Sequence, residues 1–313
     1  DQVNRTLPVG TSMMDVFGEM NGAMLILGEP GSGKTTMLLE LARDCIVRAE
    51  QDDNQPIPVI FNLSSWFNPK QSIDEWLVNE LNTKYNVSKK TAQSWVENDD
   101  LQLLLDGLDE VKSEVREVCV KAINDFRQTH GLTMSIAVCS RIADYEMLKA
   151  KLNFSGAMLL QPLTPEQIDL YFEEAGPELE GVQQILKNDA TLQELVKQPL
   201  ILSIMTLAYQ GRSAEMVATE QLDSPETRRK HLFDVYIQKM FERVARTKIE
   251  FYTAEQTKQW LIWLAQKMTE RGQSVFYLEQ IHQTMHPRTQ NILHLIFFTF
   301  IFGFLAALIG SLY

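Results

Sequence analysis

The sequence predicts an α/β fold, a parallel sheet with helices on both faces, followed by an all-α region and one C-terminal transmembrane helix. Three observations support this. Short apolar runs alternate with amphipathic segments through the first half of the chain, which is typical of parallel sheets. After Gln161 the strand patterns end and helical spacing continues. From Leu295 to Leu312 no residue is charged.

Five apolar runs are expected to form the strands, at residues 24–27, 58–63, 101–105, 134–139 and 157–160. The run 101–105 is apolar enough to be buried on both faces. Helical spacing predicts helices that begin near Lys34, after the cap residue Ser72, and across 115–126. This alternation places helices between successive parallel strands.

The second half is expected to be helical. Thr164, Pro165 and Gln167 have the cap, first-turn proline and capping-box positions of a helix start. Further helices are expected over 190–196, 200–209, from Arg229, and over 254–270, with a turn at 173–177 and a polar loop at 211–226. In the helix 254–270, we expect four residues to face inward: Trp260, Leu261, Leu264 and Met268.

A phosphate-binding motif follows the first apolar run, reading Gly28-Glu29-Pro30-Gly31-Ser32-Gly33-Lys34-Thr35-Thr36. Glycines allow the turn that directs successive N–H groups at an anion. Lys34 is expected to reach the β- and γ-phosphates, and the Thr35 hydroxyl to bind Mg²⁺. The alternative, an ordinary glycine turn, does not explain the strand and helix that flank the motif. The sequence therefore predicts a nucleotide site here.

A carboxylate-rich segment, Leu105-Asp106-Gly107-Leu108-Asp109-Glu110, follows the third run. Asp106 stands where an apolar strand ends and is the expected partner of Mg²⁺, directly or through water. Asp109 or Glu110 is expected to polarise the attacking water, the alternative being that both cap the next helix. Arg141 ends the fourth run and is expected to stabilise charge on the γ-phosphate, or else to form a surface salt bridge.

The composition limits the partners. The net charge of −12 provides no general basic field, so nucleic acid is not an expected partner. The three cysteines lack metal or redox spacing, and Cys119 and Cys139 lie in apolar runs typical of a core. This usage is typical of a reducing compartment.

Counted from Ile292, with His294 near one edge, the apolar C-terminal stretch is long enough to cross a bilayer. Small residues recur every fourth position at Gly303, Ala307 and Ser311, a spacing that lets membrane helices approach closely. A buried core helix is the alternative. Lys267, Arg271 and Arg288 precede the span, which favours a cytoplasmic location for the preceding part of the chain.

Together, the phosphate loop, the Asp106–Glu110 segment and Cys139-Ser140-Arg141 resemble the NACHT NTPases, which belong to the signal-transduction ATPases with numerous domains (STAND). The small residue after Asp106, followed by two acids, is similar to that family's form of the Walker-B segment. Asn62-Leu63-Ser64-Ser65-Trp66 resembles the stretch after the second strand in bacterial members, and the chain's ending resembles bacterial, cyanobacterial-type membrane NACHT proteins. Gln198-Pro199-Leu200 resembles the helical-domain motif, which implies that Pro199 contacts the base.

This resemblance implies five regions. They are a lead-in (1–22), a P-loop nucleotide-binding domain (23–161), a helical domain (162–215), a winged-helix-like region (216–290) and the transmembrane segment (291–313).

We therefore expect a membrane-anchored switch that binds ATP or ADP with Mg²⁺ and hydrolyses ATP slowly, its nucleotide state controlling conformation or homo-oligomer assembly. A nucleotide-binding scaffold at the membrane with weak catalysis is the first alternative. A mechanical ATPase such as a transporter motor is the second, although the sequence contains no second signature loop of the transporter kind.

Overall fold

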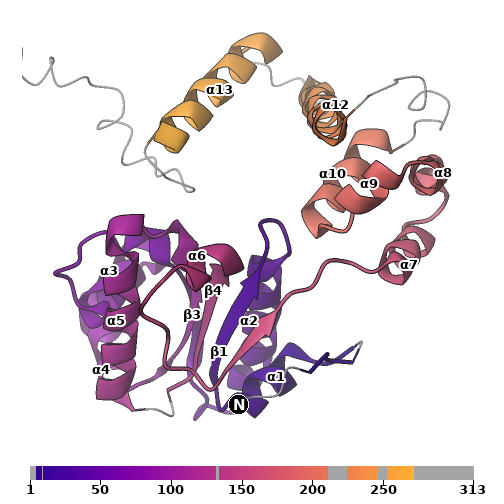
Figure 1. Cartoon of the computed structure of the whole chain (residues 1–313). Helices are drawn as coiled ribbons and strands as arrows, with labels where there is room; N and C mark the ends of the chain where they lie inside the picture. Colours follow the sequence, from indigo (N-terminus) through magenta and orange to yellow (C-terminus); the bar gives the residue numbers. More distant parts are fainter. Residues whose placement is uncertain (1–4, 9, 132–133, 211–223, 246–251, 271–313) are drawn as a thin grey trace, which may run out of the picture. The chain divides into compact units, whose positions relative to one another are not determined.

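A computed structural model describes residues 5–8, 10–131, 134–210, 224–245 and 252–270. The chain separates into two compact units, Asp1–Ala254 and Glu255–Tyr313. The first holds a sheet layered between helices and a helical part (Figure 1). Of the second, the structure describes one helix.

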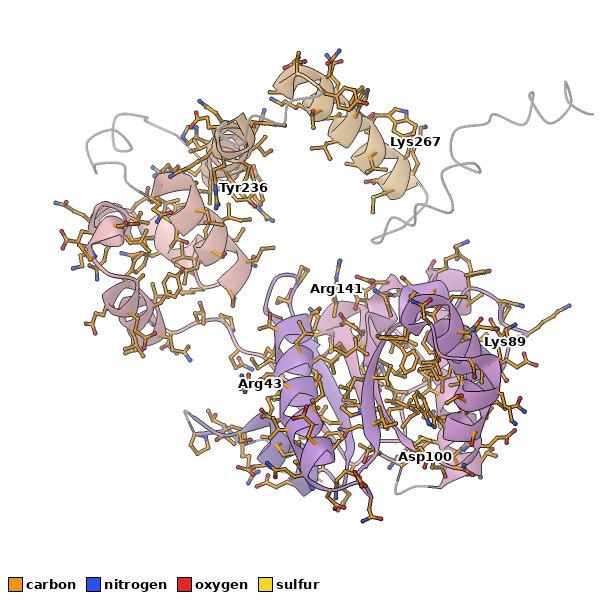
Figure 2. The ribbon with its side chains drawn as sticks, turned by 180° about the vertical axis from the view of Figure 1, so that it is seen from behind. Arg43, Lys89, Asp100, Arg141, Tyr236 and Lys267 are labelled. Atoms are coloured by element: carbon orange, nitrogen blue, oxygen red, sulfur yellow. The ribbon has the colours of Figure 1, made fainter. Side chains whose placement is uncertain are left out.

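Five parallel strands form the sheet, in the order β2-β3-β4-β1-β5. They are β1 (Ala23–Gly28), β2 (Ile57–Asn62), β3 (Leu101–Asp106), β4 (Ile136–Arg141) and β5 (Gly156–Leu159). The register aligns Gly28 with Arg141 and Asn62 with Asp106. These four residues therefore end their strands at the same edge, where ligands bind in open α/β sheets. In Figure 2, Arg141 marks this edge and Asp100, which precedes β3, marks the opposite end.

Helices cover both faces of the sheet. The helices α1 (Met13–Glu19) and α2 (Lys34–Gln51) pack on one face, and α3 (Ile73–Tyr85), α4 (Lys89–Glu97) and α5 (Ser113–His130) on the other (Figure 1). Successive residues of the strands alternate between these two cores: Leu103 and Leu105 lie in one and Leu104 in the other. The predicted double burial of this strand is confirmed, as is the burial of Cys119 and Cys139.

The helical part of the first unit has its own apolar core. Its helices are α7 (Pro165–Ala175), α8 (Glu180–Asn188), α9 (Ala190–Leu195), α10 (Pro199–Tyr209) and α12 (Pro225–Ala245), with the 3₁₀ turn η3 (Pro177–Leu179) after α7. The predicted capping box is present: the Thr164 hydroxyl accepts from the Gln167 N–H, and the Gln167 side chain accepts from the Thr164 N–H. This cap fixes where the chain leaves the sheet and becomes helical.

Several expectations need correction. The turn expected at 173–177 begins later, because α7 continues to Ala175 and only Gly176 breaks it. The loop expected at 211–226 is shorter at its end, since α12 begins at Pro225; residues 211–223 lie outside the described residues. Four described helices were not expected: α1, α4, α6 (Ile142–Glu146) and α8.

The helix α13 (Ala254–Glu270) forms where expected, but the inward orientation predicted for its apolar residues is wrong. None of its residues is buried, and Trp260 and Leu261 are more than half exposed. Apolar spacing indicates which residues share a helix face; it does not specify whether a partner covers that face.

No helix among the described residues combines the length and apolar character needed to cross a membrane. The span predicted at 291–313 lies outside the described residues.

Candidate nucleotide-binding site

The phosphate loop connects β1 to α2. Gly28 is the last residue of β1, and α2 begins at Lys34 with Gly33 as its N-cap residue. Gly31 has a φ of 76°, which side chains rarely adopt, so the loop needs a residue without a Cβ atom there. The Ser32 hydroxyl is buried without a hydrogen-bond partner. A loop at a helix N-terminus, with a buried polar atom left unpaired, suits an anionic ligand.

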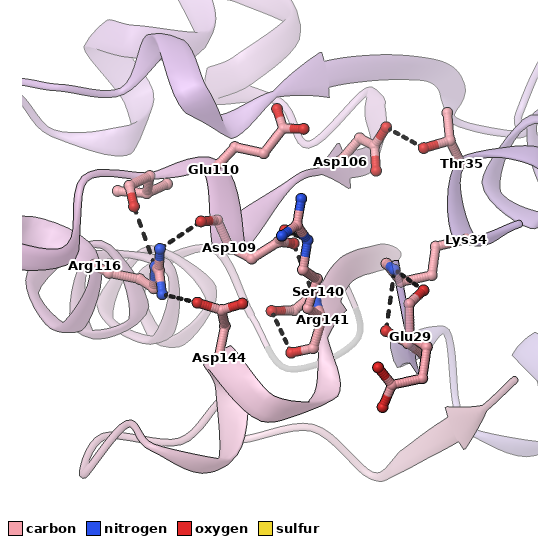
Figure 3. Close-up of polar contacts among 12 residues, drawn as sticks. Glu29, Lys34, Thr35, Asp106, Asp109, Glu110, Arg116, Ser140, Arg141 and Asp144 are labelled. Carbon is pink, nitrogen blue, oxygen red and sulfur yellow. Dashed lines mark hydrogen bonds and ion pairs between the residues drawn. The ribbon is translucent and has the colours of Figure 1, made fainter. Parts of the chain in front are cut away.

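Lys34 folds back over the loop (Figure 3). Its Nζ donates to the carbonyl oxygens of Gly28, at 3.1 Å, and Glu29, at 2.9 Å. Burial lowers the pKa of Lys34, and the nearby Arg141 lowers it further, while Asp109 and Asp106 partly oppose this. A bound polyphosphate would favour the ammonium form and offset the cost of burying it.

Thr35 and Asp106 form the contact that joins the two motifs. The Thr35 Oγ1 donates to Asp106 Oδ2 at 2.9 Å, across the gap between α2 and the end of β3 (Figure 3). A hydroxyl and a carboxylate oxygen are hard donors, which Mg²⁺ prefers. The donor set therefore fits the magnesium ion expected here, held by these two residues. Among the described residues, no group of three or more His, Cys, Asp or Glu side chains could hold a metal.

Both carboxylate oxygens of Asp109 bond to Arg141. Its Oδ2 lies 2.8 Å from Arg141 Nε, and its Oδ1 accepts from the Arg141 backbone N–H at 3.0 Å. The carboxylate is only 7% exposed, whereas the Arg141 side chain is 43% exposed. Arg141 does form a salt bridge, but with a predicted site residue.

Glu110 lies beside Asn62, the last residue of β2. Asn62 Nδ2 donates to Glu110 Oε2 at 3.3 Å. Burial raises the pKa of Glu110; the Asn62 hydrogen bond opposes this, and the charges of Asp109 and Asp106 add to it. Glu110 is the better candidate for the proton acceptor, because its pKa is raised and both carboxylate oxygens of Asp109 are already bonded to Arg141. The small residue at Gly107 has a physical reason, because its φ of 77° is one that side chains rarely adopt. A Cβ atom there would also lie 2.9 Å from the Glu110 carboxyl carbon.

The helix-capping alternative for these acids is wrong. The N-cap residue of α5 is Lys112, and it forms no side-chain cap. Asp109 and Glu110 instead lie in η2 (Leu108–Glu110), a 3₁₀ turn that ends before α5 begins. Their carboxylates are therefore free of any role in starting that helix.

The start of α10 contacts the phosphate loop. Pro199 is its first residue, and the Leu200 N–H donates to the Gly31 carbonyl at 3.2 Å. The role implied for Pro199, contact with the base of the nucleotide, stays a prediction. Glu29, Pro30 and Thr36 lie in or directly after the loop, as the motif requires.

Sequence reasoning assigned no role in the site to three residues that contact it: Asn62, Leu200 and Arg116. For Asn62 there was a signal, since it ends an apolar run, as Asp106 and Arg141 do. Leu200 belongs to the segment that resembles the helical-domain motif, but nothing in the sequence indicated its bond to Gly31. Arg116 gave no signal, because two of its partners are backbone carbonyl oxygens, which every residue has, and the third is Asp144 on another element.

Comparison with known proteins agrees with this geometry. The family model described as NACHT domain matches residues 23–178. No curated protein matches the chain. A solved structure titled "Structure of C. elegans PCH-2" is 14% identical, with a TM-score of 0.31, over 75% of this chain and 66% of that one. The chain thus covers slightly less than two thirds of that structure, and so weak a likeness adds nothing to the assignment.

The family match extends from the start of β1 into η3, and contains the phosphate loop, Asp106, Asp109, Glu110 and Arg141. The chain therefore contains a NACHT domain, which is a P-loop NTPase domain.

Proposed function

We propose that this NTPase is a membrane-anchored ATPase switch of the STAND type, in which ATP hydrolysis is slow and the bound nucleotide controls the helical part. The observation that carries the proposal is the meeting of three elements at the phosphate loop. Thr35 bonds to Asp106 of β3, Lys34 lies over the loop, and α10 bonds to Gly31. A nucleotide at this loop is thus within reach of both the catalytic edge and the helical part.

Each site residue has a distinct role in this proposal. The backbone of residues 28–36 and the ammonium of Lys34 would hold the phosphates of ATP or ADP. Thr35 and Asp106 would hold Mg²⁺, whose chemistry is to neutralise negative charge on the phosphates. Glu110, with its raised pKa, would take a proton from the attacking water. Asp109 would hold Arg141 at the edge where the terminal phosphate lies.

The switch would act through α10. The Leu200 N–H donates to the Gly31 carbonyl. If the loop moves when phosphate binds, this hydrogen bond would move the first turn of α10 with it. The core of the helical part includes Ile201, Leu202 and Leu232, so α10 and α12 would respond together. Pro199 would contact the base. Such a device needs a change of state and little turnover.

Membrane anchoring by residues 291–313, a cytoplasmic NTPase domain and homo-oligomer assembly on activation complete the proposal. Their support is the uncharged run after Leu295 and the basic residues that precede it. Fractionation of the full chain and of a variant ending at residue 290 would test the anchor. Equal recovery of both from the membrane fraction would contradict it.

A scaffold without useful catalysis is the second candidate. The ion pair between Asp109 and Arg141 favours it, because that carboxylate already has a partner for each oxygen. Phosphate release by the full chain with ATP and Mg²⁺ separates the two. The switch predicts slow release that stops in Glu110→Gln while ATP affinity is kept. The scaffold predicts retained nucleotide and no release from the wild type.

A further inference from the structure

Arg116 connects two segments of the catalytic edge, and all three of its guanidinium nitrogens are used (Figure 3). Its Nε donates to the Val111 carbonyl at 3.1 Å and its Nη2 to the Asp109 carbonyl. Its Nη1 pairs with Asp144 Oδ1 at 2.8 Å. The side chain is 12% exposed, so these bonds form largely out of solvent.

The two carbonyls come from the end of η2, where no further helical turn follows to bond them. In a helix the last carbonyl oxygens lack internal partners, and an arginine side chain is one way to satisfy them. Arg116 lies in the first turn of α5 and folds back to do this. This contact therefore holds the backbone on both sides of Glu110, at Asp109 and at Val111.

The third nitrogen extends the connection to α6, the helix that directly follows β4. Asp144 lies in α6, three residues after Arg141. Arg141 is bonded to the Asp109 carboxylate through both its side chain and its backbone. The turn η2 and the segment 141–144 are thus joined in two ways. Asp109 bonds directly to Arg141, and Arg116 bonds to both η2 and Asp144.

We propose that Arg116 is a positioning residue for the ATPase reaction: it holds the η2 acids and Arg141 in register with one another. This inference rests on the proposed function. Arg116 contacts neither Lys34 nor Thr35, so it would act on turnover and leave nucleotide binding unchanged.

The test compares Arg116→Met with Arg127→Met in the full chain. Arg127 is a matched control: it lies on the same helix, is 5% exposed, and donates to the Asn153 carbonyl at 2.7 Å, away from the site. We expect Arg116→Met to lower kcat about tenfold with the ATP Kd within about twofold, because small misplacement of reacting groups costs rate. Arg127→Met should keep kcat. Arg116→Lys, which keeps the charge beside Asp144, should recover part of the loss.

Equal loss of kcat in both Met variants, or no loss in Arg116→Met, would overturn the proposal. A wild type that binds nucleotide without hydrolysing it would contradict the proposed function alone. In that case, amide hydrogen exchange still tests whether Arg116 holds the two segments together. In Arg116→Met, amides of residues 108–111 and 141–144 should exchange at least about tenfold faster, with residues 28–36 unchanged. Unchanged exchange at 141–144, or equal acceleration at all three segments, would also overturn it.

Discussion

The backbone N–H of Leu200, at the start of α10, donates a hydrogen bond to the carbonyl of Gly31 in the phosphate loop at 3.2 Å. The approach is close: a Cβ atom at Gly31 would lie 2.9 Å from the Leu200 Cβ. The helical part and the nucleotide site therefore meet at a position where only glycine fits. In the proposed switch, this contact is the route by which a bound nucleotide would affect the helical part.

Gly31→Ala should weaken ATP binding about tenfold or more and lower the free energy of unfolding by at least about 1 kcal/mol, because it adds both a strained φ and a clash. Gly176→Ala is the control, since its φ of 80° is also one that side chains rarely adopt, but nothing lies within 4 Å of a Cβ atom there. Calorimetric titration with ATP and thermal unfolding measure both effects. If Gly176→Ala weakened ATP binding as much, the loop contact would not be the cause.

Glu110→Gln should abolish phosphate release while ATP affinity is kept, because the amide cannot accept the proton of the attacking water. Asp109→Asn should instead weaken the hold on Arg141 and lower the rate without abolishing it. Phosphate-release assays at saturating ATP distinguish these roles. A larger loss in Asp109→Asn would reverse the assignment of the two acids.

Turnover should rise with pH through the pKa of Glu110, which burial raises above its ordinary value of 4.5, since only the ionised carboxylate accepts a proton. Asn62→Ala removes a hydrogen bond that favours the ionised form. The acid limb of the kcat profile should therefore move to higher pH. An acid limb that stayed in place, or moved to lower pH, would show that Asn62 does not favour the ionised form of Glu110.

Thr35→Val should remove most of the Mg²⁺ dependence of ATP binding, because the hydroxyl that bonds to Asp106 is lost while the shape of the side chain is kept. Thr83→Val on α3 is the control, since that hydroxyl donates to the Asn79 carbonyl of its own helix. Titrations with and without Mg²⁺ test this. A full magnesium effect in Thr35→Val would place the metal elsewhere.

His130, at the end of α5, should make stability depend on pH. Its two ring nitrogens lie 2.7 Å from Asp74 and Asp99. Burial lowers the pKa of His130, but the hydrogen bonds and charges of the two carboxylates together raise it above 6.5. A group with a raised folded-state pKa stabilises fully below its unfolded pKa, and the contribution is lost as the pH rises through the folded value.

His130→Gln should therefore cost about 1 kcal/mol near pH 5.5, and less near pH 9, allowing for the solvent screening of two half-exposed aspartates. Urea unfolding at both pH values measures the difference. In the Asp74→Asn/Asp99→Asn background the pH dependence of the His130→Gln effect should disappear. An effect that grew with pH would mean that the histidine is neutral in the folded protein.

The sheet and the nucleotide site were predictable because both depend on local signals. Apolar runs define the strands, and motifs such as Gly28–Thr35 fix residue types at fixed spacing. The parallel arrangement then brings Asp106 and Arg141 to one edge without further information.

What local signals do not predict is how charge is shared between neighbours. Asp109 and Glu110 are adjacent and chemically alike, yet one is paired with Arg141 and the other has a raised pKa. That difference comes from the burial of Glu110, which the hydrogen bond from Asn62 opposes, and from the bonds between Asp109 and Arg141 on another strand. The inward orientation predicted for the apolar residues of α13 was wrong for a related reason, because helical spacing does not specify which element packs against a face.

The central claim is that a nucleoside triphosphate binds at the loop under Lys34, and calorimetric titration of the full chain with ATP and Mg²⁺ tests it directly. Lys34→Met should weaken ATP binding by about tenfold to a hundredfold, since a charge-assisted hydrogen bond to phosphate is lost. Lys89→Met, far from the site on α4, should bind as the wild type does (Figure 2). Equal affinities in the wild type and Lys34→Met would contradict the account.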